Sequence, residues 1–174
     1  MSTSMNHKHA VDALIAAMAD DHGLTRLKAR QALVAMKQNA VAPLVKALQN
    51  PDWRIRWGAA MALGQIGDPS AADALIKSLE DELAGVRWLA AEALIALGST
   101  GLHALLEALI HHSDSLWLRD GAHHIIHDIM DKDPELSQVL APVTAALDDI
   151  EPVIEVPPAA QTALRQLSKE LSPV

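Results

Sequence analysis

Histidines gather in one segment of the C-terminal half of the chain. Five of the nine lie between His111 and His127, and the densest group reads His123-His124-x-x-His127. On a helix, His124 and His127 would share a face with Asp120, because residues three and four positions apart lie one above the other. Two imidazoles and a carboxylate around an open coordination position form many zinc and non-haem iron sites. The spacing therefore permits a metal, with Asp120, His124 and His127 as the candidate ligands.

The same residues also fit a simpler interpretation. One helix seldom supplies all the ligands of a tight metal site, since its side chains diverge and need support from other elements. A solvated patch whose charge follows pH is the favoured interpretation of these histidines. Ser113 and Ser115 lie near them in the sequence, but no nucleophile-elbow motif surrounds either serine. An enzyme is therefore not the leading expectation, and no cofactor is predicted.

The composition predicts a single helical domain. Half of the 174 residues are apolar, Phe, Tyr and Cys are absent, and alanine and leucine supply most of the apolar count. Such a chain favours helix over strand and has no thiolate for a disulfide or a metal. The formal charge of −8 opposes attraction to phosphate backbones, so nucleic acid is an unlikely partner.

The apolar runs and the first residues bear on the location of the protein. Even the run Leu89–Leu97 contains Glu92, so none reaches the roughly 18 uninterrupted apolar residues that a membrane span requires. The N-terminal segment lacks a positive region, and Asp12 interrupts its apolar stretch before a signal-peptide core can form. The sequence thus predicts a cytoplasmic protein without a membrane span, and it leaves the oligomeric state open.

A nine-residue segment recurs along the chain at intervals of 30 to 32 residues. Residues 55–63 (IRWGAAMAL) and 86–94 (VRWLAAEAL) agree at Arg, Trp, three Ala and Leu. Residues 25–33 and 118–126 repeat the pattern in a weaker form. One repeat position holds arginine in all four copies: Arg26, Arg56, Arg87 and Arg119. A period of this length indicates a solenoid of stacked helical hairpins.

Turns rich in Gly, Pro, Asp and Ser separate the predicted units. One domain, 9–174, is expected to follow a flexible N-terminus, 1–8. The expected units are 9–39, 40–70, 71–101, 102–138 and 139–172. In the last of them, Pro157-Pro158 suits the first turn of a final helix that ends near Leu171.

The pattern Val-Arg-x-x-Ala-Ala-x-Ala-Leu resembles the short HEAT-like repeats of the phycobilisome lyase type. The matching residues are Arg56, Arg87 and Arg119, then Ala59, Ala90 and Ala122, then Leu63, Leu94 and Ile126. The resemblance implies an all-α fold, a right-handed α-solenoid of about five two-helix repeats. It says less about function, because such repeats occur in chromophore lyases, in hydroxylases and in adaptors. No histidine here is followed by glutamate, so the di-iron hydroxylases of this fold are set aside.

The periodicity of apolar residues in the second helix of each unit predicts a core face and an open face. Ile55, Ala59 and Leu63 fall in one apolar sector, whereas Trp57 and Met61 lie opposite. Second helices of stacked repeats usually line the concave surface. The open positions of consecutive units form what we call the binding strip: Trp57, Met61, Trp88, Glu92, Ile95, Asp120, His124 and His127.

Tryptophans and arginines each allow two interpretations. Exposed tryptophans are typical of interfaces, but Trp57 and Trp88 could equally pack over the neighbouring helix. Trp53 and Trp117, near the starts of their helices, are expected to pack. The repeat arginines are interpreted as structural, because an aspartate precedes each by four to six residues and suits a charge-assisted bond. These aspartates are Asp21, Asp52, Asp81 and Asp114.

The leading prediction is a non-enzymatic interaction scaffold that holds a protein segment, a peptide or a helix, along the binding strip. Its two tryptophans would bury an apolar partner, and its acidic and histidine end would select a polar or basic flank. The alternative is a chromophore-lyase-like protein that holds a tetrapyrrole, or a metal-binding protein, using residues 123–127.

Overall fold

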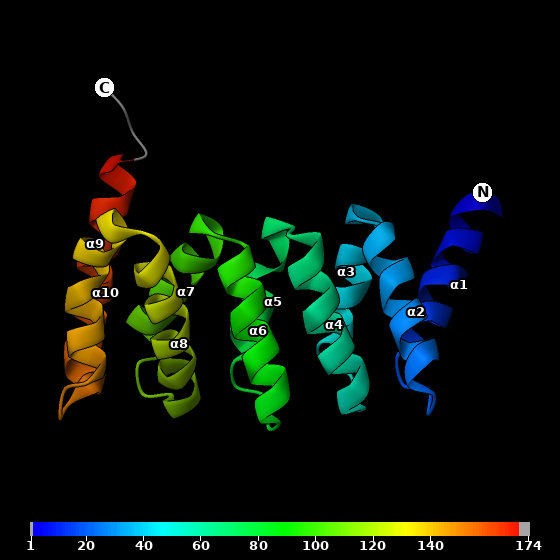
Figure 1. The fold of residues 1–174 in the computed structure, drawn as a ribbon, viewed down its shortest axis with the longest axis horizontal. Helices are drawn as coiled ribbons and strands as arrows, with labels where there is room; N and C mark the ends of the chain where they lie inside the picture. Colours follow the sequence, from blue (N-terminus) through cyan, green and yellow to red (C-terminus); the bar gives the residue numbers. More distant parts are fainter. Residues whose placement is uncertain (1, 171–174) are drawn as a thin grey trace.

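Helices account for almost all of the chain (Figure 1). This computed structural model describes the backbone of residues 2–170 and the side chains of residues 9–168. The described helices are α1 Ser2–Ala17, α2 Gly23–Ala35, α3 Gln38–Ala47, α4 Trp53–Ile66, the 3₁₀-helix η1 Pro69–Ala71, α5 Ala72–Ser78, α6 Ala84–Ala96, α7 Ser99–His111, α8 Leu116–Lys132, α9 Pro134–Leu147 and α10 Pro152–Glu170. Helix α1 begins at Ser2, so residues 2–8, predicted as a flexible end, are helical instead.

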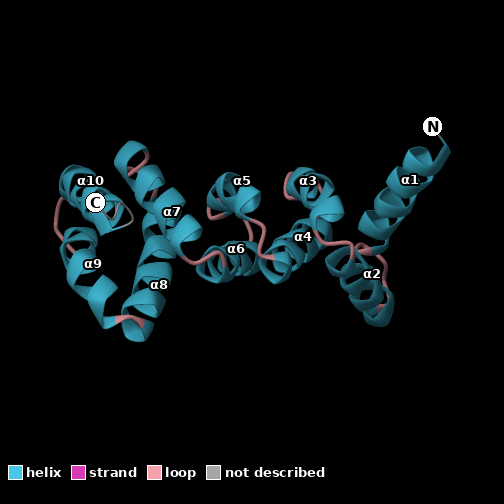
Figure 2. Ribbon diagram, turned by 90° about the horizontal axis from the view of Figure 1, so that it is seen from above, coloured by secondary structure: helices cyan, strands magenta, loops and turns pink. Residues whose placement is uncertain are grey.

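The helices form two layers that run the length of the molecule (Figure 2). Helices α2, α4, α6 and α8 pack side by side in one layer, and α1, α3, α5 and α7 lie behind them. Each unit touches mainly its neighbours, and the two chain ends lie at opposite ends of the array. The prediction of an all-helical solenoid is confirmed. No helix among residues 2–170 is both long and apolar enough to cross a membrane.

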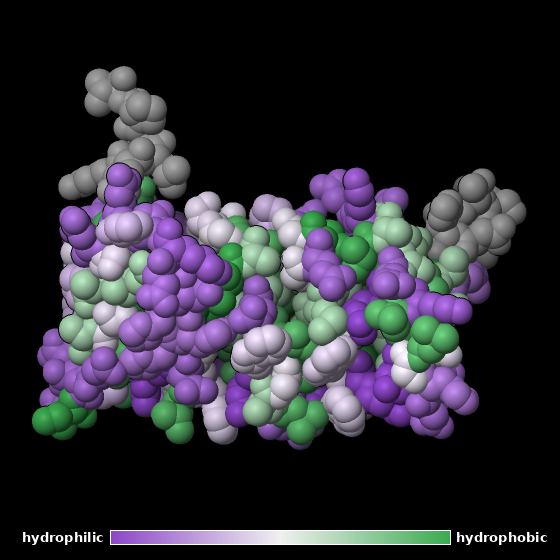
Figure 3. All heavy atoms as spheres, viewed as in Figure 1, coloured by the Kyte–Doolittle hydropathy of each residue, from purple (hydrophilic) through white to green (hydrophobic). Residues whose placement is uncertain are grey.

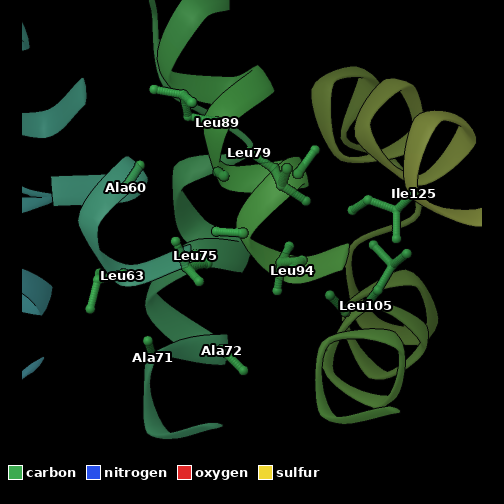
Figure 4. Packing of buried hydrophobic residues seen from close by; sticks show 14 of the residues in the cluster. Ala60, Leu63, Ala71, Ala72, Leu75, Leu79, Leu89, Leu94, Leu105 and Ile125 are labelled. Atoms are coloured by element: carbon green, nitrogen blue, oxygen red, sulfur yellow. The ribbon is translucent and has the colours of Figure 1, made fainter. Parts of the chain in front are cut away.

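The core lies between the two layers and follows the repeat (Figure 4). Leu63 and Leu94, the predicted core leucines of two successive second helices, are fully buried. Leu75 and Leu105 from the first helices meet them in the same cluster. Each such leucine contributes about 1.5–3 kcal/mol by leaving water. The units are therefore held together by one continuous hydrophobic core rather than by a separate core in each hairpin.

The last two helices are placed in the opposite order from the earlier units. Helix α9 packs on α8 and extends the layer of second helices, whereas α10 packs on α7. The expected boundary near residue 139 is wrong: α9 starts at Pro134, because Asp133 caps its N-terminus and accepts from the backbone N–H of Glu135. Helix α10 starts at Pro152, so Pro157 and Pro158 lie inside it rather than at its start. The predicted end at Leu171 lies outside the described residues.

A buried serine compensates for Pro157 inside α10. Proline has no backbone N–H, so Pro157 leaves the carbonyl of Val153 without its helical donor. The Ser113 hydroxyl, buried in the turn before α8, donates to this carbonyl at 3.0 Å. The interaction ties the final helix to the fourth unit and gives Ser113 a structural role.

Ser113→Ala should lower the free energy of unfolding by about 1–2 kcal/mol, because it leaves a part-buried carbonyl unsatisfied. Ser168 is the matched control: its exposed hydroxyl also donates to a helix carbonyl, that of Leu164. Ser168→Ala should change the stability by less than about 0.5 kcal/mol. Urea denaturation followed by circular dichroism measures both. Equal effects of the two substitutions would contradict the role of Ser113.

Candidate binding surface

The binding strip lies on the layer formed by α4, α6 and α8. Figure 3 shows this face: hydrophilic residues cover its C-terminal part, over α8 and α9, and apolar residues mix with pale ones in the middle. Trp88 is 55% exposed. Asp120, His124 and His127 are also exposed, whereas Met61, Glu92 and Ile95 are half-buried. The face that helical periodicity predicts is thus open to solvent.

A groove of about 320 Å³ runs between α4 and α6 along the strip. Met61 and Gly64 form one wall, and Trp88 and Glu92 form the other. The two helices approach closely here, since a Cβ on Gly64 would lie 3.0 Å from the Cβ of Ala93. Because the two helices pack closely, the Trp88 side chain lies beside a shallow apolar groove. This geometry suits the insertion of an apolar side chain next to the indole.

Trp57 combines packing with partial exposure. The Arg30 guanidinium lies over its ring, 5.4 Å from the centroid, and Gly85 of α6 approaches its indole nitrogen. The packing interpretation therefore applies to Trp57 in part, whereas Trp88 is open.

The expectation that Trp53 and Trp117 are packed is wrong. Trp53 is 51% exposed and Trp117 is 45% exposed. The Arg87 guanidinium covers one face of the Trp117 ring at 3.7 Å from its centroid. Both indoles lie in the first turn of their helices, next to the turn within a unit.

The histidines at the polar end of the strip interact with different partners. His124 contacts Glu92 of the preceding unit at 2.7 Å, which joins two strip residues across α6 and α8. His127 instead stacks on His123, with ring centroids 6.0 Å apart. The His123 ring nitrogen Nε2 also lies 3.4 Å from the carboxylate of Asp148, the residue that follows α9. Within the described part of the chain, no three His, Cys, Asp or Glu side chains are arranged to hold a metal ion.

The repeat arginines bind the turn that precedes their own helix. Their Nη1 atoms donate to backbone carbonyls: Arg26 to Asp20 and Asp21, Arg56 to Asn50 and Pro51, Arg87 to Asp81 and Glu82, and Arg119 to Ser113. The structural interpretation holds, but the predicted carboxylate partners are wrong. Asp52, for example, is engaged locally: it caps α4 and pairs with Arg54, which lowers the pKa of its carboxyl group.

Among the described residues, Arg56 is the repeat arginine that pairs with carboxylates of the next unit. Its Nε and Nη2 donate to the two carboxylate oxygens of Asp81 at 2.6 and 3.1 Å, and Nη2 also donates to Glu82 at 2.9 Å. The Asp81 hydrogen bond raises the pKa of Arg56. Both Arg56 and Asp81 are buried, so this pair locks the second unit to the third.

A second pocket, of about 260 Å³, lies between α2 and α4 beside Trp57. Its lining residues are Met18, Arg26, Arg30, Trp53, Arg54, Trp57 and Gly58. This pocket is not among the features predicted from the sequence, although the repeat contains a signal for it. Arg30 stands at the repeat position that Ala60 and Ala91 occupy in the next two units.

Stacked helical hairpins with one open layer define an α-solenoid, a class that offers an extended surface for binding. A family model described as HEAT repeats matches residues 11–95 and again residues 41–126. The chain therefore belongs to the HEAT repeat family, whose members are generally scaffolds for protein interactions. The search of curated proteins found no match to the chain.

Proposed function

We propose that this protein is a non-enzymatic adaptor that binds an extended peptide or a helix along the binding strip, with Trp88 as the central contact. The exposed indole beside the groove of Met61 and Glu92 is the observation that carries the proposal. A rigid aromatic ring next to an apolar channel loses little entropy when it is covered, so it is a typical centre of binding energy.

The charges at the polar end of the strip favour one orientation of a bound peptide. Glu92 and Asp120 place negative charge beyond the tryptophan, and His124 bridges to Glu92. A basic residue in the partner would therefore be favoured on this side. The alternative of a tetrapyrrole or a metal at residues 123–127 has no comparable support, since those histidines contact Glu92, Asp148 and one another.

Selection of a random-peptide display library on the folded protein should enrich peptides that bind through Trp88. Trp88→Ala should weaken their binding by about 30-fold, the loss of a contact worth about 2 kcal/mol. Fluorescence anisotropy of a labelled, enriched peptide measures the dissociation constant. The helical circular dichroism signal of the variant should be unchanged.

Trp117 is the matched control, because its ring is similarly exposed but lies off the strip at the start of α8. Trp117→Ala should change the dissociation constant by less than about twofold. The proposal would be overturned if no peptide were enriched. It would also fail if the two tryptophan substitutions had the same effect.

A further inference from the structure

The pocket between α2 and α4 contains a residue that departs from the alanine of the next two units. Ala60 of α4 and Ala91 of α6 occupy this repeat position and are buried. The long Arg30 side chain stands in that place on α2 and occupies the space between α2 and α4. Its guanidinium lies along the Trp57 ring. Ala60 lines the apolar groove between α4 and α6, whereas the pocket between α2 and α4 carries a cation at the same repeat position.

Arg30 is the cation of this pocket with no anionic partner among the residues whose side chains are described. Arg54 is paired with Asp52 and Asp21, and Arg26 donates to the carbonyls before its own helix. Among the described side chains, the Arg30 guanidinium interacts only with the Trp57 ring, and partial burial lowers its pKa. A half-buried guanidinium whose donors are free is well suited to a planar anion, which it can bind through two parallel hydrogen bonds.

The pocket is sized for a side chain. Sites for whole small molecules enclose roughly 300–1,000 Å³, and this one holds about 260 Å³. Its walls are aromatic and apolar where Trp53, Trp57 and Met18 line it. A carboxylate carried on a short apolar stem, as in glutamate or aspartate, matches both the charge and the walls.

We propose that the Arg30 pocket binds an acidic side chain of the same partner peptide that the binding strip holds, and that this contact sets the direction of the peptide. The inference rests on the proposed function and adds a specific requirement to it. Trp57 lines the pocket and begins the strip, so the two sites are continuous. The surface then runs from a free cation at α2 to the acidic Glu92 and Asp120 at α6 and α8. A partner with an acidic residue before its apolar residue and a basic residue after it would be complementary throughout.

Peptides from the display library provide the test. Enriched sequences should carry Glu or Asp at one side of their apolar residue. Arg30→Gln should weaken binding of such a peptide by about 10- to 100-fold, the range expected for charge-assisted hydrogen bonds. Lys28→Gln is the matched control, because Lys28 is an exposed cation of the same helix outside the pocket. It should change the affinity by less than about twofold.

A double-mutant cycle assigns the contact. Replacing the acidic residue of the peptide by its amide (Glu by Gln, or Asp by Asn) should weaken binding to the wild-type protein as much as Arg30→Gln does. The same peptide change should weaken binding to the Arg30→Gln variant by almost nothing more. Peptides that depend on Trp88 but carry no acidic residue would overturn this inference and leave the proposed function intact. Equal effects of Arg30→Gln and Lys28→Gln would do the same. The absence of any Trp88-dependent peptide would overturn both.

Discussion

Arg56→Ala is expected to lower the free energy of unfolding by about 3–5 kcal/mol, the cost of breaking a buried ion pair by removing one partner. For a domain of this size the midpoint of thermal unfolding should fall by about 6–20 °C. Thermal and urea denaturation followed by circular dichroism measure the change. The free energy of unfolding of natural domains is only about 5–15 kcal/mol, so the substitution removes a large share of the stability.

The reason lies in the number of contacts that one guanidinium makes. Its five N–H donors serve Asp81, Glu82 and the carbonyls of Asn50 and Pro51. Arg56 is 8% exposed. Removing it leaves the buried Asp81 carboxylate without a counter-charge and two carbonyls without donors. Because a solenoid is stabilised by contacts between neighbouring units, the loss is concentrated at the boundary between the second and third units.

Arg119 provides the control at the same repeat position. It donates to the carbonyl of Ser113 but forms no ion pair with a carboxylate of the described residues. Arg119→Ala should therefore cost only about 1–2 kcal/mol. In Arg56→Ala combined with Asp81→Ala, no buried charge is left unpaired, since Glu82 is exposed, so the double variant should be more stable than the sum of the two single effects predicts. Equal losses at Arg56 and Arg119 would show that the carbonyl contacts alone account for the role of the arginine.

The sequence predicts the hairpin array well because the same apolar positions recur in each copy. Leu63 and Leu94 occupy one repeat position and are both fully buried. The pattern ends after Ile126, and from there no copy indicates which layer a helix joins. The exchanged order of α9 and α10 depends on the packing of α10 against α7, a contact between segments distant in the sequence. Local periodicity carries no information about such a contact.

The sequence predicts which face of the helices is open, but it does not predict the contacts and pockets on that face. Helical periodicity places both Trp57 and Trp88 on the open face, and it does not indicate that Trp88 is the more exposed of the two. The contact of Arg56 with Asp81 spans 25 residues of sequence and depends on how closely two turns approach. Arg30 could have been singled out from the sequence, because the next two units hold alanine at its repeat position and a charged side chain there needs space or a partner.

Gly101→Ala should destabilise the protein by about 3 kcal/mol, although the repeat itself would suggest the opposite. Buried alanines, Ala40 and Ala71, stand at the corresponding place in the two preceding units. Alanine also favours helix over glycine by about 1 kcal/mol. A comparison of repeats would therefore predict a stabilising substitution. Urea denaturation decides between the two predictions by the sign of the change.

The geometry of α6 and α7 explains the expected loss. A Cβ on Gly101 would overlap the carbonyl oxygen of Leu94, and backbone atoms cannot rotate away as a side chain can. Helix α7 would have to shift, but it is held by α5, α6, α8 and α10. Gly85→Ala is the control: the added methyl group meets only the Trp57 ring, at 3.7 Å, an ordinary contact. It should be neutral or stabilising by up to about 1 kcal/mol. If Gly101→Ala were equally stabilising, α7 would have to be free to move, and the rigid contact between α6 and α7 would be refuted.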